Sequence, residues 1–577
     1  MIQFRIDVAD VATHRFSVTL TVPAPAAETT VSLPVWIPGS YLVREFGRHL
    51  SLLQARQGRQ SRPLTQQDKS TWTVSCQGHA ALVIQYEVYA FDASVRTAFL
   101  DDRRGFFNTT SLCLRVHGRE EVPQQVQIGQ LPKGWEVATA MPADAGEHTY
   151  VSADYDELAD HPFELGRFWR GQFEAGGVPH EFVVAGAWPG FDGERLLADA
   201  KRICATQIAF WHGRRKPPFA RYVFLLNAVE DGYGGLEHRA STALIAKRAD
   251  LPRAGMASPV PEGYMTLLGL ISHEYFHTWN VKRLKPVEFL RYDYTRENYT
   301  ELLWFFEGFT SYYDDLLLVR AGLLDVPRYL KLLARTVNGV LATPGRQVQS
   351  VAEASFDAWV KYYRSDENTP NSTVSYYTKG SLVALLLDLR LRQAGSSLDV
   401  LMRALWARCL RTGLTEADVL AEVERLAGAA LAGELQTWVH GRDELPLAEA
   451  LTALGVQVGH ESPAWVAALG LRLSEGPITG VQVKSVLRGS AAARAGVSAG
   501  DELLAVDGWR IRRLDDARQW LPPEPVPFEL TLVRQQRLRT LTLRPEPHPA
   551  ESWTLTLAES PAAQAQALAL RKAWLGR

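Results

Sequence analysis

Apolar and polar residues alternate along much of the first 165 residues of the chain. The alternation is clearest in Ile2–Val8, Phe16–Val22 and Leu82–Val88, where every second side chain is apolar. A period of two is typical of strands that bury one face. Turn-forming stretches such as Pro38-Gly39-Ser40 separate these runs. The pattern predicts an N-terminal antiparallel, sandwich-like β domain over residues 1–165.

From about residue 166 to residue 455 the pattern changes to a few strands followed by helices. An alternating run at Tyr222–Leu226 comes first. Apolar residues then recur every three or four positions in four segments, which are residues 262–282, 297–321, 374–393 and 400–412. This spacing predicts helices. Residues 166–455 are therefore expected to form an α-rich domain built on a small sheet.

Short strand patterns return at residues 461–546. Frequent glycines separate them, and one short helix is predicted around residues 514–521. This segment is expected to form a third domain. Residues 547–577 are rich in alanine and are expected to contain a C-terminal helix. The predicted fold class is therefore multidomain α+β.

Composition narrows the range of functions. The 577 residues are 46% hydrophobic and 22% charged, which is typical of folded globular proteins. The formal net charge is −2 and no basic block is present, which argues against a nucleic-acid partner. No apolar run approaches the roughly 20 residues that span a bilayer, and the N-terminus lacks the pattern of a secretory signal. We expect a soluble, cytoplasmic protein that does not enter membranes.

The cysteines do not indicate a disulfide framework or a thiolate metal site. Cys76, Cys113, Cys204 and Cys409 lie far apart, and no C-x-x-C spacing occurs. We expect them to pack as small, reduced hydrophobic residues.

Candidate chemistry is concentrated in residues 273–277, which form an H-E-x-x-H pattern inside a predicted helix. Residues four apart on a helix lie one above the other, so His273 and His277 can bind a single metal ion. Glu274 is placed to act as general base on a water at that ion. Two histidines that merely satisfy partners on a buried helix are the alternative explanation of so short a pattern.

A catalytic zinc site with two histidines often takes a glutamate as its third protein ligand. Glu307 lies downstream in a run rich in phenylalanine, where burying a lone carboxylate would be costly. The alternatives are Glu301 as the ligand, or a surface position for Glu307 in which it pairs with Arg320 or Lys282. We expect Glu307 to complete a site for one Zn²⁺ per chain.

Two further segments carry residues suited to peptide hydrolysis. Gly234 and Gly235 let a backbone approach closely, and Glu237 can bind the free amino terminus of a substrate. A simple hairpin turn with a solvated glutamate is the alternative. Tyr377 begins a predicted helix and can donate a hydrogen bond to an oxyanion, although its pairing with Tyr376 also fits simple packing.

These segments resemble the glycyl aminopeptidase family of zinc peptidases, which carry a PDZ domain. The resemblance covers essentially the whole chain and rests on residues 36–41, 232–239, 273–286 and 307–313. It implies a thermolysin-like catalytic domain at residues 166–455. It also implies aminopeptidase activity on peptides that have a free N-terminus and a small first residue, glycine or alanine.

The wider gluzincin aminopeptidases are similar at two of the candidate positions. Their G-x-M-E-N and Y-x-K-G segments resemble residues 234–238 and 377–380. This resemblance supports Glu237 as amine anchor and Tyr377 as oxyanion donor. Leu236 and His238 depart from the methionine and asparagine of that pattern.

Residues 461–546 resemble a PDZ domain. Leu469, Gly470 and Leu471 are similar to its carboxylate-binding loop, and residues 490–508 to its central run. The resemblance implies a groove that accepts the C-terminus of a peptide as an added strand. A closed groove that serves packing or self-contact is the alternative.

The sequence therefore favours a zinc-dependent aminopeptidase that uses a metal-activated water. One alternative is a non-catalytic, chaperone-like protein that binds peptides through its PDZ domain. Another is a zinc endopeptidase, which would need an open cleft beyond Glu237. The intact set of ligands and base favours catalysis, and comparing free with N-acetylated peptides separates the two peptidase types.

Overall fold

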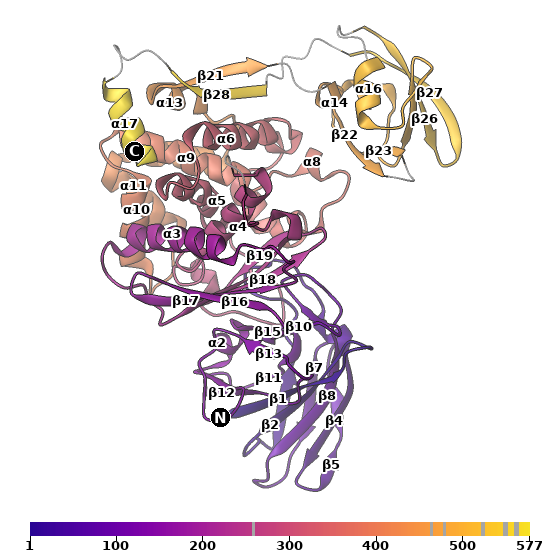
Figure 1. Cartoon of the computed structure of the whole chain (residues 1–577), viewed down its shortest axis with the longest axis vertical. Coiled ribbons are helices and arrows are strands. Elements are labelled where there is room, and N and C mark those ends of the chain that lie inside the picture. Colours follow the sequence, from indigo (N-terminus) through magenta and orange to yellow (C-terminus); the bar gives the residue numbers. More distant parts are fainter. Residues whose placement is uncertain are drawn as a thin grey trace. The chain divides into compact units, whose positions relative to one another are not determined.

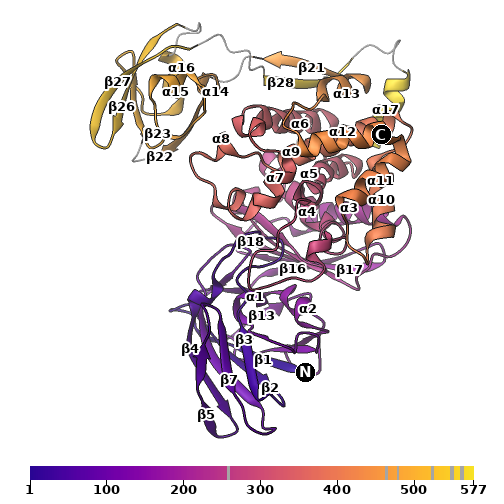
Figure 2. The same cartoon turned by 180° about the vertical axis from the view of Figure 1, so that it is seen from behind.

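The computed structural model of the chain describes residues 1–256, 260–461, 465–476, 480–520, 526–545, 552–558 and 565–576 (Figures 1 and 2). Internal contacts divide the chain into two units. The first unit comprises Met1–Tyr299, Tyr313–Leu324 and Leu405–Thr415, and the second comprises Thr300–Tyr312, Asp325–Ala404 and Glu416–Arg577. Two helices, α5 (Leu303–Arg320) and α10 (Leu398–Cys409), pass from one unit into the other.

The N-terminal part of the first unit contains three sheets. The largest is seven-stranded, with the order β14-β12-β1-β2-β8-β4-β5. Its strands are β1 (Ile2–Asp10), β2 (Arg15–Val22), β4 (Leu50–Gln57), β5 (Gln60–Arg62), β8 (Leu82–Tyr89), β12 (Gln124–Ile128) and β14 (Thr149–Ser152). Strands β2, β8 and β4 lie side by side in Figure 1. The sheet is not fully antiparallel, because β1 pairs in parallel with β12.

Two four-stranded sheets complete this region, with the orders β13-β15-β10-β9 and β11-β3-β7-β6. Their strands are β3 (Glu28–Ser32), β6 (Leu64–Gln66), β7 (Thr71–Ser75), β9 (Ala98–Leu100), β10 (Arg104–Asn108), β11 (Arg115–Val116), β13 (Glu136–Ala138) and β15 (Pro162–Gly166). Short helices α1 (Thr109–Leu112) and α2 (Tyr155–Ala159) lie between strands in the sequence.

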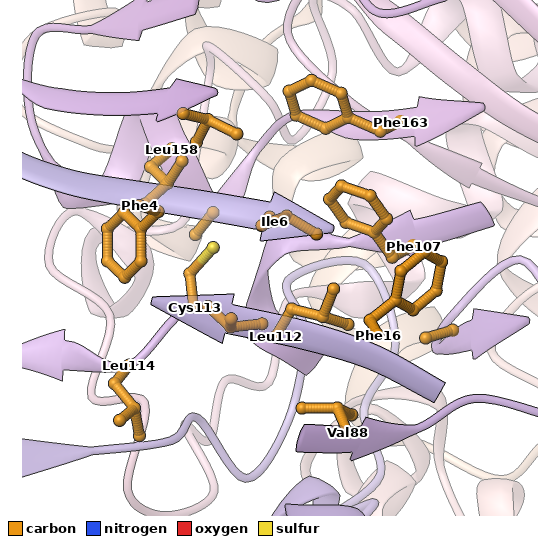
Figure 3. Packing of buried hydrophobic residues seen from close by; sticks show 14 of the residues in the cluster. Phe4, Ile6, Phe16, Val88, Phe107, Leu112, Cys113, Leu114, Leu158 and Phe163 are labelled. Atoms are coloured by element: carbon orange, nitrogen blue, oxygen red, sulfur yellow. The ribbon is translucent and has the colours of Figure 1, made fainter. Parts of the chain in front are cut away.

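The alternating residues of the first strands form the core of this region, as their spacing predicts. Phe4 and Ile6 of β1 and Phe16 of β2 are almost fully buried. Figure 3 shows them in one cluster with Phe107 and Phe163, whose rings stack with centroids 5.0 Å apart. All four cysteines lie in the described part of the chain, where they are buried and are not joined in disulfides.

A five-stranded sheet forms the base for the helices of the first unit, with the order β16-β17-β18-β20-β19. Its strands are β16 (Trp169–Ala175), β17 (Val178–Ala185), β18 (Tyr222–Val229), β19 (Tyr233–Glu237) and β20 (Ser241–Lys247). Helix α3 (Gly193–His212) packs on β16, and α4 (Glu262–Phe276) contacts α3, β19 and β20. Strand β19 lies at one edge of this sheet, next to α4.

Helix α4 ends at Phe276, six residues before the end that its apolar spacing predicts. The chain turns there instead, because Lys282 donates its backbone N–H to the His277 carbonyl and Val281 to that of Leu284. Val281 takes φ 93°, a left-handed conformation that is strained for a β-branched residue. The spacing of apolar residues in this segment does not predict the turn.

Helices dominate the second unit up to residue 453. They are α6 (Val326–Leu341), α7 (Val351–Phe356), α8 (Thr369–Ser372), α9 (Thr378–Gln393), α11 (Glu416–Ala427), α12 (Ala429–His440) and α13 (Leu447–Ala453). Helix α9 contacts α6, α12 and α13, which lie beside it in Figure 2. Within the described part of the chain, no helix combines the length and apolarity needed to cross a bilayer.

The region that resembles a PDZ domain has its own sheet and core. The sheet runs β22-β23-β24-β26-β27, and β25 pairs with β24. These elements are α14 (Trp465–Ala468), β22 (Leu471–Gly476), β23 (Gly480–Val486), α15 (Ala491–Ala495), β24 (Glu502–Val506), β25 (Trp509–Arg510), α16 (Leu514–Trp520), β26 (Phe528–Arg534) and β27 (Arg537–Leu543). Strands β21 (Val456–Glu461) and β28 (Ser552–Leu557), which precede and follow it in the sequence, pair with each other.

The C-terminal helix α17 (Ala565–Leu575) is anchored in the second unit. The buried indole of Trp574 donates a hydrogen bond to the Tyr312 hydroxyl over 2.9 Å. Tyr312 in turn donates to Asp388 of α9 over 2.5 Å. The sequence predicts the helix, and the structure adds that it is tied to α5 and α9.

Candidate metal-dependent active site

The H-E-x-x-H motif occupies the C-terminal end of α4. His273 lies in the last turn, and His277 caps the helix with nearly helical angles, φ −60° and ψ −19°. The two histidines therefore keep the i, i+4 arrangement although the helix ends between them. Their Nε2 atoms are 3.1 Å apart.

The other nitrogen of each ring is held by an acceptor. His273 Nδ1 lies 3.0 Å from the Asp314 carboxylate, and His277 Nδ1 lies 2.9 Å from the Asn280 carbonyl. The Asn280 carbonyl can only accept, so His277 Nδ1 carries the proton and its Nε2 presents a lone pair; His273 takes the same tautomer when Asp314 is ionised. When both Nε2 atoms present lone pairs, they repel each other at 3.1 Å, and a cation bound by both removes that repulsion. This donor chemistry fits a bound metal ion.

Asp314 is a functional candidate that no sequence motif singles out. It follows Glu307 by seven residues on α5, so two helical turns place both carboxylates on the same side of that helix. Burial raises the pKa of Asp314, an effect that a cation bound by the His273 ring would oppose. The seven-residue spacing is the sequence signal that could have identified it.

Glu307 joins the two histidines, as expected. Ligand atoms of His273, His277 and Glu307 all lie within 4.8 Å of one another. Glu307 is 2% exposed, whereas the alternative ligand Glu301 is exposed and precedes α5. The three residues form a set of two imidazoles and one carboxylate that can hold a divalent metal ion, as in many catalytic zinc sites.

Strand β19 presents alternate residues to α4. A side chain at Gly235 would overlap the carboxylate of Glu274, so the glycine allows the candidate base to pack against the strand. Glu237, two residues on, faces the same side of the strand. Gly234 lies beside the guanidinium of Arg96, which donates to the Gly235 carbonyl. Substrate binding by Gly234 and Gly235 stays a prediction.

A buried ion cluster ties the end of β19 to the turn after α4. The Asp160 carboxylate accepts from Lys282 Nζ over 2.6 Å and from Arg239 Nε over 3.0 Å. His238 Nδ1 lies 3.3 Å from the same carboxylate. Burial alone would raise the pKa of Asp160, but Lys282, His238 and Arg239 together hold it well below its usual value. His238, one of the two departures from the gluzincin pattern, therefore belongs to this ion cluster.

Tyr377 lies at the N-terminus of α9 and is only partly buried, whereas Tyr376 is fully buried. Burial raises the pKa of Tyr377 well above its usual value, and the charge of Glu307 raises it further. The phenol therefore keeps its proton at neutral pH and can donate it in a hydrogen bond. Its hydroxyl lies 3.3 Å from that of Tyr363, a residue that no sequence motif singles out.

The predicted carboxylate loop of the PDZ region precedes β22. Gly470 has φ +73°, donates its N–H to the Ala467 carbonyl and accepts from the N–H of Leu487. Leu469 and Leu471 are buried in the core of this region. Because the Gly470 N–H already donates to the Ala467 carbonyl, neighbouring amides would have to bind a peptide carboxylate. Carboxylate binding by this loop stays a prediction.

Comparisons with known proteins give three family-model matches along the chain. The family models are the peptidase M61 N-terminal domain at residues 3–167, M61 glycyl aminopeptidase at residues 266–383 and a PDZ domain at residues 482–534. The second match contains the candidate ligands, base and oxyanion donor. A comparison with curated proteins gives no match.

A solved structure, described as an aminopeptidase N family protein from Idiomarina loihiensis, is similar over the full length. The two sequences are 36% identical, 100% of each chain is covered, and the TM-score is 0.94. An M1 zinc metallopeptidase from Deinococcus radiodurans is 16% identical, with 77% of this chain and 94% of that chain covered and a TM-score of 0.48. Yeast LTA4 hydrolase is 12% identical, with 78% and 70% covered and a TM-score of 0.45. The last two proteins are too distant to bear on the function of this chain.

Proposed function

The chain belongs to the M61 glycyl aminopeptidase family and is a metallo-aminopeptidase; on this basis we propose that it removes small N-terminal residues, glycine or alanine, from peptides. The proposed cofactor is one Zn²⁺ per chain, bound by His273, His277 and Glu307. The observation that carries the proposal is the convergence of these three ligands within 4.8 Å. Family membership also decides against a non-catalytic, PDZ-based protein.

In the proposed reaction the metal ion acts as a Lewis acid, and residues of the chain transfer the proton and stabilise the oxyanion. Zinc, when bound, supplies Lewis acidity that lowers the pKa of water and polarises the scissile carbonyl. Glu274 takes a proton from the attacking water and passes it to the leaving amine. Glu274 is 5% exposed and its carboxylate packs against β19. This packing supports the role, because a base held in one position is oriented toward the proton that it takes. Tyr377 donates a hydrogen bond to the developing oxyanion.

Glu237 is the proposed anchor for the substrate ammonium. Glu237 is 4% exposed, and it lies on the same face of β19 as Gly235, against which Glu274 packs. A carboxylate beside the base holds the amino terminus at a set distance from the reacting bond, so that only the first peptide bond is cleaved. The PDZ region is proposed to bind a peptide C-terminus or to make a self-contact, and a soluble, cytoplasmic location is also a prediction.

Replacement of Glu237 by alanine tests the anchor. We expect kcat/KM on glycyl and alanyl arylamides to fall at least about 30-fold, because loss of one partner of a buried charge pair costs about 2 kcal/mol or more. Zinc content should stay unchanged. Glu301→Ala, at an exposed glutamate, is the matched control and should behave as wild type.

N-acetylated peptides separate this proposal from an endopeptidase. The wild-type enzyme should cleave them far more slowly than the same peptides with a free amino group. Equal rates on both, or wild-type kinetics in Glu237→Ala, would contradict the proposed anchor.

A further inference from the structure

Gly39 of the N-terminal β region lies against the carboxylate of Glu237. A Cβ built at Gly39 would lie 2.5 Å from Oε1 and 2.6 Å from Oε2 of that carboxylate. Such distances are too short for non-bonded atoms, so the bare backbone is what lets the carboxylate come this close. Gly39 also has φ +96°, which other residues rarely adopt. Residues 36–41, here called the β-domain loop, therefore form a wall beside the candidate amine anchor.

The β-domain loop is fixed in place by the segment that follows the metal-binding helix. The Trp36 indole donates to the Asp293 carbonyl over 2.8 Å. The N–H of Val35, the residue just before the loop, donates to the Tyr294 carbonyl over 2.9 Å. Trp36 is fully buried and packs edge-on against Tyr292. Moving the loop would break these contacts. A side chain added at Gly39 would therefore displace the Glu237 carboxylate instead of the loop.

We propose that the β-domain loop is a positioning element for the amine anchor, with Gly39 holding the Glu237 carboxylate where it receives the substrate ammonium. This inference rests on the proposed role of Glu237. The loop wall stops the carboxylate from rotating away from the reacting bond. The N-terminal β region thereby takes part in selecting the first peptide bond. Misplacement of a positioning group by about 1 Å can lower a rate about 100-fold, so a single methyl group at Gly39 should have a measurable effect.

The first test is Gly39→Ala, measured on glycyl and alanyl arylamides. We expect kcat/KM to fall at least about tenfold on both substrates, mainly through KM, because the ammonium is common to them. Gly118→Ala is the matched control: Gly118 has φ +76° but nothing within 4 Å of its built Cβ, so alanine adds backbone strain without a contact. Zinc content and thermal unfolding of the two variants should agree.

A double variant tests whether the effect passes through Glu237. The shorter side chain in Glu237→Asp withdraws the carboxylate from the loop, so adding Gly39→Ala to it should change kcat/KM less than about twofold. Gly39→Ala activity equal to that of Gly118→Ala would overturn the inference. So would an undiminished effect in the Glu237→Asp background, or a loss confined to alanyl substrates, which would indicate a side-chain pocket.

A second variant keeps the inference testable if Gly39→Ala does not fold. Trp36→Phe removes the hydrogen bond to Asp293 that holds the loop while keeping an aromatic ring. It should raise KM for both substrates at unchanged zinc content, and wild-type kinetics would overturn the inference. The roles of the anchor and of the loop can fail separately. If Glu237→Ala has no effect, the proposed anchor is wrong; if Glu237→Ala impairs the enzyme but the loop variants do not, only the role of the loop is wrong.

Discussion

Replacement of Glu274 by glutamine is expected to lower kcat about 100- to 10,000-fold, the usual contribution of a general base. Glutamine keeps the size of the side chain and its packing against Gly235 but cannot take a proton. The metal ligands are untouched, so zinc content should equal that of the wild type. KM should change little, because the base acts on the attacking water and not on substrate binding.

The measurement is steady-state hydrolysis of alanyl arylamide together with metal analysis of the same sample. Glu262→Gln is the matched control, since Glu262 is exposed in the first turn of the same helix. Wild-type turnover in Glu274→Gln with a full complement of zinc would remove Glu274 from the mechanism. Loss of zinc would instead show that Glu274 supports the metal site.

Replacement of Asp160 by alanine should lower the free energy of unfolding by about 3–5 kcal/mol, the usual effect of removing one partner of a buried ion pair. Lys282 is 3% exposed and would lose the carboxylate that lies 2.6 Å from its Nζ. Denaturation by urea measures the change. Asp231→Ala is the control, because the Asp231 side chain is 81% exposed in its pair with Lys247, and we expect no measurable change there.

The dependence of stability on acid pH should also report on the Asp160 carboxylate. The pKa of Asp160 is lower in the folded protein than in the unfolded chain, so its stabilising contribution is complete above about pH 4 and is lost as the pH falls through the folded-state value. The wild-type protein should therefore lose stability below about pH 4 more steeply than Asp160→Ala. Parallel stability curves for the two proteins over this range would contradict the assigned ion cluster.

The cluster of His273, His277 and Glu307 could be predicted from sequence because the signals for it lie in short segments. The i, i+4 spacing of His273 and His277 already places two ligands on one helix face, and the apolar surroundings of Glu307 single out a carboxylate that needs a partner. Strand alternation predicted the buried faces of β1 and β2 in the same way. Each of these inferences spans only a few residues of one element.

Contacts between distant segments could not be predicted. Asp160 and Lys282 are 122 residues apart in the sequence, and nothing local marks either as a partner. Gly39 is typical of a turn, and only the fold shows that it faces Glu237. The early end of α4 depends on the strained turn at Val281, which helical spacing cannot reveal. Tertiary packing determines which distant residues meet. The periodicity of a single sequence reports local structure and does not show these pairings.

Hydrolysis should depend on one zinc ion held by His273, His277 and Glu307. Zinc titration of the chelator-treated enzyme tests this dependence, with bound metal and hydrolysis of glycyl and alanyl arylamides followed in the same samples. We expect activity to rise in proportion to bound zinc and to stop rising at one ion per chain, and we expect His277→Ala neither to bind the ion nor to recover activity. Hydrolysis at the full rate by the metal-free enzyme, or by His277→Ala, would show that the reaction does not need this site.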